Sequence, residues 1–227
     1  MTDGSVRRVG GWCAIGVAVA YVVAAALYFV APAGLRSNEA PLYWRAVIDY
    51  PQLAVAGSWV IAVSGILGLG AVAAISAFVR STNAGWVNWM QNLALMGFAL
   101  TAVSSARQAT VTYDRAARFF CGECTVEDNF RKIIDVTQQL VPLDPGGLFT
   151  FGGIGLWVLT VSALALRGHA FPATISAIGI ALAAAYFVAV ISNLTGADPL
   201  RTIAFAVGAI LALAWYGWIG MELRRAS

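Results

Sequence analysis

Six long apolar segments dominate this chain and decide what it can fold into. They cover approximately 10–31, 53–79, 86–106, 149–166, 173–192 and 203–221. A helix needs roughly 20 apolar residues to cross the hydrocarbon core of a bilayer, which is about 30 Å thick. The segments are continuously apolar rather than alternating, and backbone groups in lipid must be satisfied within their own segment, so helices are favoured over a β-barrel. The sequence predicts an all-α, polytopic transmembrane bundle of six helices.

The composition agrees with a lipid environment. Hydrophobic residues make up 60% of the 227 residues and charged residues only 11%, whereas soluble domains usually carry about 25% charged residues. We therefore expect residues 1–227 to form a single membrane domain with the lipid bilayer as its main partner. The net charge of +3 is small and scattered, which argues against nucleic acid as a partner.

The N-terminal segment has features of a signal peptide. Arg7 and Arg8 precede the apolar run, and Ala31-Pro32-Ala33 has the small residues of a cleavage site. The run of 10–31 is longer than a usual signal core and long enough to span a bilayer. We expect an uncleaved signal-anchor helix.

Basic residues in the short loops predict the orientation. With the N-terminus inside, the outer pieces carry eight basic and nine acidic residues, and both short inner turns, 80–85 and 167–171, are basic. The cytoplasmic pieces contain two acidic residues, Asp3 and Glu222, and six basic ones: Arg7, Arg8, Arg80, Arg167, Arg224 and Arg225. By the positive-inside rule both termini are cytoplasmic. Richness in Ala, Gly and Val suggests a bacterial source, so we expect a multi-pass protein of the inner membrane.

The first outer loop, 34–52, contains a predicted short helix. Pro41 suits the first turn of a helix and Pro51 ends it. Arg45 and Asp49 lie one helical turn apart. We expect this helix to lie in the membrane interface, with aromatic side chains at headgroup level.

Three amides open the third apolar segment. Asn88, Gln91 and Asn92 follow an i, i+3, i+4 spacing and share one helix face. They form either a polar recess for a small ligand or lipid headgroup, or a packing face that makes hydrogen bonds between helices; the second is favoured.

The ionisable residues that transport chemistry needs are missing from the middle of the spans. No span has an Asp, Glu, Lys or His in its central portion, and such residues mark proton relays and ion paths. The one histidine, His169, falls in a cytoplasmic turn. A transporter is therefore disfavoured, and no metal or other cofactor is expected.

A polar segment, 107–148, separates the third and fourth spans and is predicted to form a helical cap outside the cytoplasm. The third helix is expected to continue past Arg107, with Asp114 and Arg118 one turn apart and Arg115 beside them. A second, amphipathic helix is expected over 125–141.

The cap also contains a pair of cysteines. Cys121 and Cys124 have three interpretations: a structural disulfide, a redox-active pair, or half of a metal site. Acidic neighbours, among them Glu123 and Glu127, disfavour the thiolate that redox chemistry requires. A metal site lacks further cysteine or histidine ligands in the cap. The disulfide is favoured.

A hairpin in the second half of the chain resembles hairpins of six-helix bacterial integral membrane proteins. The similarity lies in the Gly-rich stretch 148–157, the short basic turn and proline of 165–172, and Ile178-Gly179. It implies a topology and no activity.

These observations predict a non-enzymatic integral membrane protein. The first hypothesis is an accessory or assembly subunit of a membrane complex, or a protein that binds a lipid or another hydrophobic ligand. The alternatives are a membrane thiol-disulfide oxidoreductase that uses Cys121 and Cys124, and a small-molecule transporter.

Overall fold

The computed structural model describes residues 3–37, 39–119 and 144–225. In this part of the chain all regular structure is helical, which confirms the predicted all-α class. The cysteine pair Cys121 and Cys124, and the second cap helix predicted over 125–141, lie outside the described residues.

Seven α-helices and three short helical segments make up the described structure. The α-helices are α1 (Asp3–Val30), α2 (Ala40–Asp49), α3 (Pro51–Val79), α4 (Ala84–Phe119), α6 (Ile154–Gly168), α7 (Ala173–Thr195) and α8 (Asp198–Arg225). The short segments are the 3₁₀ helices η1 (Ala33–Arg36) and η2 (Pro145–Gly147) and the π-helix η3 (Leu148–Gly153).

Five helices are long and apolar enough to cross a membrane. They are Gly4–Val30, Pro51–Val79, Leu148–Gly168, Ala173–Thr195 and Pro199–Arg225. The third predicted span, 86–106, lies within α4, which has 36 residues and extends about 54 Å at 1.5 Å per residue. The amides near the start of α4 and the polar residues after Val103 interrupt its apolar stretch, so α4 is not among the five.

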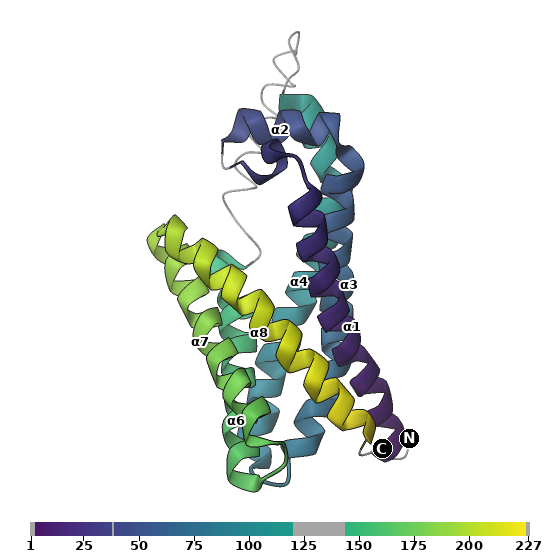
Figure 1. Ribbon diagram of the computed structural model, residues 1–227, viewed down its shortest axis with the longest axis vertical. Helices are drawn as coiled ribbons and strands as arrows, with labels where there is room; N and C mark the ends of the chain where they lie inside the picture. Colours follow the sequence, from purple (N-terminus) through teal and green to yellow (C-terminus); the bar gives the residue numbers. More distant parts are fainter. Residues whose placement is uncertain (1–2, 38, 120–143, 226–227) are drawn as a thin grey trace.

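The six long helices form a closed ring. Each packs most extensively against two neighbours, in the order α1, α3, α4, α6, α7, α8 and back to α1 (Figure 1). The N- and C-termini lie together at one end of this ring. The guanidinium carbon of Arg224 on α8 lies 3.8 Å from the ring centroid of Trp12 on α1, which ties the two terminal helices together at that end.

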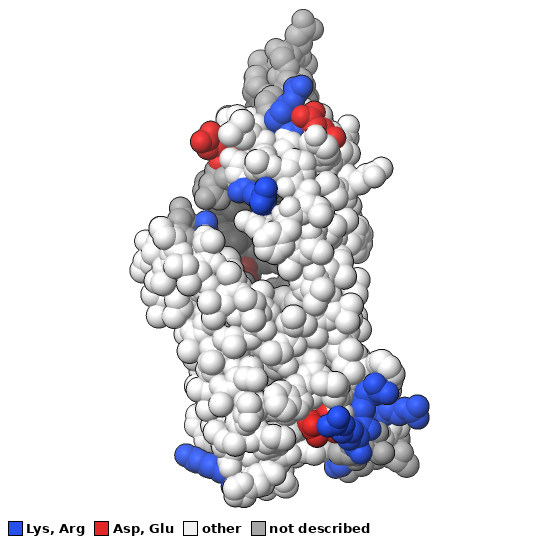
Figure 2. Space-filling view, viewed as in Figure 1, with Lys and Arg blue, Asp and Glu red and all other residues white. Residues whose placement is uncertain are grey.

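Charged side chains gather at the two ends of the molecule. Figure 2 shows them above and below a broad, largely uncharged surface. Exposed hydrophobic side chains cover the long helices between these ends, such as Val22 on α1, Ile66 on α3 and Ile210 on α8. A bilayer is the solvent that such a surface requires.

Small residues allow close contacts between helices inside the ring. A Cβ atom added at Gly65 of α3 would lie 2.6 Å from the backbone nitrogen of Ala102 on α4. In α8, Ala204 and Ala212 are buried. Without a hydrophobic force between helices in lipid, this close van der Waals packing holds them together.

The short helix predicted in the loop 34–52 is present, and Arg45 and Asp49, one turn apart on it, form an ion pair. Helix α2 lies across the end of the molecule opposite the termini (Figure 1). Pro51 begins α3 directly after Tyr50. Arg45 Nε lies 3.6 Å from Asp49 Oδ2, and both side chains are exposed, so this pair adds little to stability.

The fourth predicted span begins differently from a plain α-helix. Its first five residues belong to the π-helix η3 (Leu148–Gly153), a local geometry that periodicity does not reveal. The backbone N–H groups of Phe149 and Thr150 donate to the two carboxylate oxygens of Asp144, at 2.9 Å and 2.7 Å. A carboxylate at this position satisfies free donors and complements the helix dipole.

Candidate binding pocket

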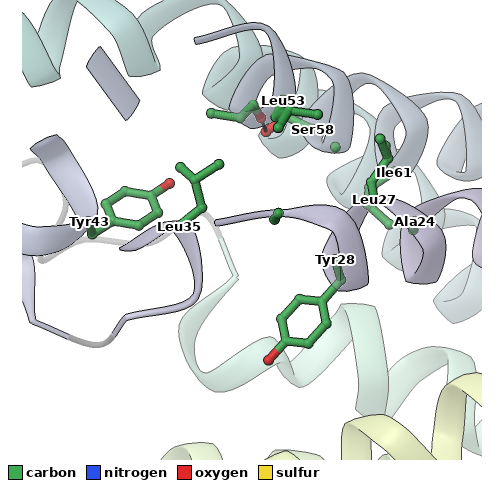
Figure 3. A pocket seen from close by; sticks show the side chains of 11 residues that line it. Ala24, Leu27, Tyr28, Leu35, Tyr43, Leu53, Ser58 and Ile61 are labelled. Atoms are coloured by element: carbon green, nitrogen blue, oxygen red, sulfur yellow. Dashed lines mark hydrogen bonds between the residues drawn. The ribbon is translucent and has the colours of Figure 1, made fainter. Parts of the chain in front are cut away.

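An apolar pocket of 250 Å³ lies between α1 and α3 beneath α2 (Figure 3). Helix α1 contributes Ala24, Leu27, Tyr28 and Ala31; α3 contributes Leu53, Ala54, Gly57, Ser58 and Ile61; Leu35 of η1 and Tyr43 of α2 complete the wall. The lining is mostly aliphatic, so the pocket favours an apolar occupant.

The short segments between α1 and α3 form the outer wall of this pocket. Helix α1 ends at Val30, and η1 follows Pro32 and places Leu35 against the space. A Cβ atom added at Gly34 would lie 2.7 Å from Cβ of Ala46, so η1 and α2 pack closely together. Val47 on the same helix is fully buried, which anchors α2 to the bundle.

Small side chains account for the empty volume. Gly57 on α3 lines the pocket, and a Cβ atom added there would meet nothing within 4 Å. Ala24 and Ala54 line the same space from facing helices. Larger residues at these positions would fill it.

Few polar groups border the pocket. The hydroxyl of Ser58 donates to the Ala54 carbonyl of its own helix, at 3.4 Å. Burial raises the pKa of Tyr43 above its ordinary value of 10.0, and a side-chain hydrogen bond with Gln108 acts in the opposite direction. This phenol is therefore neutral at physiological pH.

In Figure 3 the Tyr43 ring lies near Leu35, whereas the Tyr28 ring points away from them.

If α1 spans the membrane, the pocket lies near the boundary of the hydrocarbon that is far from the chain termini. At 1.5 Å per residue, Ala24 is about 24 Å and Ala31 about 35 Å along the helix from Arg8. A hydrocarbon core about 30 Å thick ends between these two levels. In that case the occupant of the pocket would come from the leaflet opposite the chain termini.

A second hollow, of 410 Å³, lies between the same two helices nearer their middle. Gly16, Val19 and Val23 line it from α1, and Trp59 and Val63 are among the residues that line it from α3. Two hollows thus lie along the contact between α1 and α3.

The predicted amide face lies on the surface of α4. Asn88 and Asn92 are exposed, and Gln91 accepts a hydrogen bond of 3.1 Å from Arg80, at the C-terminal end of α3. Gln91 therefore contributes to the contact between two helices. Whether Asn88 and Asn92 meet a lipid headgroup or another helix stays a prediction.

The charged residues predicted for the cap lie on the C-terminal third of α4. The helix continues past Arg107 to Phe119, as predicted, and carries Asp114, Arg115 and Arg118. Arg107, Asp114 and Arg118 are exposed, and Arg115 is half-buried. They do not line the pocket.

A buried aromatic and hydroxyl cluster in the middle of the ring is absent from the sequence predictions. Trp157 Nε1 donates a hydrogen bond of 2.9 Å to Ser76 Oγ. The Trp157 and Trp215 rings meet edge to face at 5.7 Å, and the Trp215 and Tyr216 rings at 4.8 Å. The hydroxyls of Tyr21 and Tyr186 lie 3.5 Å apart. The sequence feature that could have predicted this cluster is the presence of Trp and Tyr, which carry a polar group, inside the apolar segments.

The pocket residues carried a weaker signal. Pro32 ends one span, Pro41 starts the interfacial helix, and Leu35 and Arg36 lie in the short stretch between them. Because this stretch is short, its residues must lie close to the ends of the helices that it connects.

Comparison of the chain with protein-family models, curated proteins and solved structures gives no match. The resemblance of 148–179 to six-helix bacterial membrane proteins stays a prediction. Inferences about function therefore rest on the geometry of the described residues.

Proposed function

We propose that this chain is a non-enzymatic integral membrane protein that binds a lipid or another hydrophobic ligand in the pocket beneath α2. The observation that carries the proposal is the pocket itself. It is lined mainly by aliphatic side chains. With α1 spanning the bilayer and the termini in the cytoplasm, it would lie at the depth where the acyl chains of the outer leaflet meet their headgroups.

Six membrane crossings and cytoplasmic termini are part of the proposal. Five helices have the length and composition of spans, yet the two termini lie at the same end of the molecule (Figure 1), which requires an even number of crossings. Helix α4 is the remaining member of the ring, between α3 and α6. The concentration of arginine near the termini supports a cytoplasmic location for that end, in a bacterial inner membrane.

Packing energetics support an occupied pocket. Atoms that line an empty space lose dispersion contacts that a filled interior would provide. A flexible apolar chain restores these contacts without leaving a polar group unpaired. Surrounding lipid offers such chains at high local concentration, so the pocket would be filled whenever the protein is in a membrane.

Filling the pocket with a side chain tests the proposal. Gly57→Leu places a leucine in the space, and Ala77→Leu, at an exposed position of the same helix outside the lining, is the matched control. Native mass spectrometry after purification in a mild detergent measures the bound hydrophobic molecules. We expect the wild type and Ala77→Leu to retain one bound molecule and Gly57→Leu to lose it.

The Gly57→Leu variant is suited to this test because it should fold. An added Cβ meets no neighbour within 4 Å, and glycine in a helix interior is about 1 kcal/mol less favourable than a good helix former. An unchanged or raised Tm would show that the fold is intact. A wild type without a bound molecule, or a Gly57→Leu protein that retains it, would contradict the proposal.

A further inference from the structure

Arg36 lies beside the pocket. The guanidinium carbon of Arg36 lies 5.7 Å from the ring centroid of Tyr28, which lines the pocket. Arg36 is exposed and directly follows Leu35, another lining residue. The guanidinium thus contacts the exposed ring of a residue at the rim of the pocket, and this ring points away from Leu35 and Tyr43.

This charge lacks an acidic partner within the described part of the chain. No carboxylate there forms an ion pair with Arg36, although Glu39 is only three residues away. Arg45, on the neighbouring helix α2, is paired with Asp49. Among the described residues, Arg36 is therefore a cation beside the pocket that has no acidic partner and can receive an anion from outside the protein.

We propose that the ligand of this pocket is an outer-leaflet amphiphile with an anionic headgroup, whose acyl chain occupies the pocket while its phosphate or carboxylate pairs with Arg36. This inference rests on the proposed function. A guanidinium forms two parallel hydrogen bonds with a phosphate or a carboxylate, a geometry that an ammonium cannot reproduce.

The pocket and Arg36 lie at membrane depths that the acyl chain and the headgroup of one lipid molecule would occupy. The pocket lies where α1 reaches the outer edge of the hydrocarbon, and Arg36 follows the end of α1 by only six residues, folded into the compact turn η1. The headgroup region adds about 5–8 Å on each side of the hydrocarbon. A lipid with its chain beside Ala31 would therefore have its anionic group at the level of Arg36.

The test compares ligands with the same acyl chains, with and without an anionic group. Delipidated protein in a neutral detergent is titrated by calorimetry with a short-chain phosphatidylglycerol and with the diacylglycerol that has the same chains. A second pair is a fatty acid and its monoglyceride. We expect the charged member of at least one pair to bind wild type about tenfold more tightly, the effect of one charge-assisted hydrogen-bonding pair. The pair with the larger ratio identifies phosphate or carboxylate as the preferred group.

Variants assign this preference to one side chain. Arg36→Gln should bind charged and uncharged ligands equally while keeping wild-type affinity for the uncharged ones, which shows that the pocket is intact. Arg36→Lys should keep part of the preference. Arg45→Gln, which removes a nearby but paired charge, should keep all of it.

The outcomes separate the two proposals. Equal binding of charged and uncharged ligands by wild type, or an undiminished preference in Arg36→Gln, overturns the headgroup inference and leaves the hydrophobic pocket standing. If none of the four ligands binds, or if Gly57→Leu binds all of them like wild type, the proposed function fails and this inference fails with it.

Discussion

At the scale of single residues, hydroxyl and indole groups make the buried polar contacts of this structure, and the conspicuous amides do not. Asn88 and Asn92 are exposed, whereas Ser76 and Trp157 are completely buried and joined by a hydrogen bond of 2.9 Å between α3 and α6. The spacing of the amides could be read from the sequence. The pairing of Ser76 with Trp157 could not, because the two residues are 81 positions apart and meet only when the ring closes.

Removal of the Ser76 hydroxyl should destabilise the protein. Ser76→Ala leaves the buried Trp157 N–H without its acceptor, and an unsatisfied buried donor costs about 1–3 kcal/mol. Ser64→Ala is the matched control, because Ser64 is also buried on α3 but donates to the Ile61 carbonyl of its own helix. Thermal unfolding in detergent should show a lower Tm for Ser76→Ala only. Equal losses in the two variants would show that the hydrogen bond between helices has no special weight.

At the scale of elements, the apolar segments predicted the position of each long helix described, but most predicted bounds were shorter than the observed helices. The first and last spans were predicted as 10–31 and 203–221, whereas α1 begins at Asp3 and α8 ends at Arg225. Hydrophobicity predicts only the part of a helix that contacts lipid. The helix itself can continue into water, because its backbone hydrogen bonds do not depend on lipid. Pro41 and Pro51 predicted α2 correctly because proline acts locally. The pocket could not be predicted, because its volume depends on how far α1 and α3 diverge beneath α2.

Helices α3 and α4 approach so closely at Gly65 that one added methyl group there should destabilise the protein. Gly65→Ala brings a Cβ atom to 2.6 Å from the backbone nitrogen of Ala102, and a backbone cannot rotate aside as a side chain can. We expect a loss of about 1–3 kcal/mol in the free energy of unfolding, as for other overpacked sites. Gly57→Ala, eight residues earlier on the same helix, has open space and should be neutral or stabilising by up to about 1 kcal/mol.

Equilibrium unfolding in detergent can measure the free energy of unfolding of both glycine variants under the same conditions. A Gly65→Ala protein as stable as Gly57→Ala would mean that α3 and α4 separate without cost, contrary to the close packing that membrane helices depend on.

At the scale of the whole molecule, the fold class followed from the sequence, while the ring order did not. Short loops already imply that α3 neighbours α4 and that α6 neighbours α7. The contact between α1 and α8 closes the ring through residues more than 200 positions apart, including Trp12 and Arg224. Both ends of the chain carry arginines, and the positive-inside rule places them on one side without showing that they touch.

The path of α4 decides how many times the chain crosses the membrane. Single cysteines can report it in a background with Cys13, Cys121 and Cys124 changed to serine. Asp49, Thr82 and Thr110 are exposed and lie, respectively, at the end of α2, in the turn before α4, and on the outer part of α4. Six crossings with cytoplasmic termini place Asp49→Cys and Thr110→Cys on the outer side of the membrane and Thr82→Cys on its cytoplasmic side.

A membrane-impermeant maleimide should therefore label Asp49→Cys and Thr110→Cys in intact spheroplasts, and Thr82→Cys only after the membrane is opened. If α4 does not cross, Thr82 and Thr110 stay on one side and become reactive together. If the orientation is inverted, Thr82→Cys alone reacts in intact cells, and the pocket beneath α2 then faces the cytoplasmic leaflet. Because α4 lies between α3 and α6 in a closed ring, its removal from the membrane would open the ring and expose Phe98 and Ala94, which are buried. Closure of the ring therefore favours labelling of Thr82 and Thr110 from opposite sides.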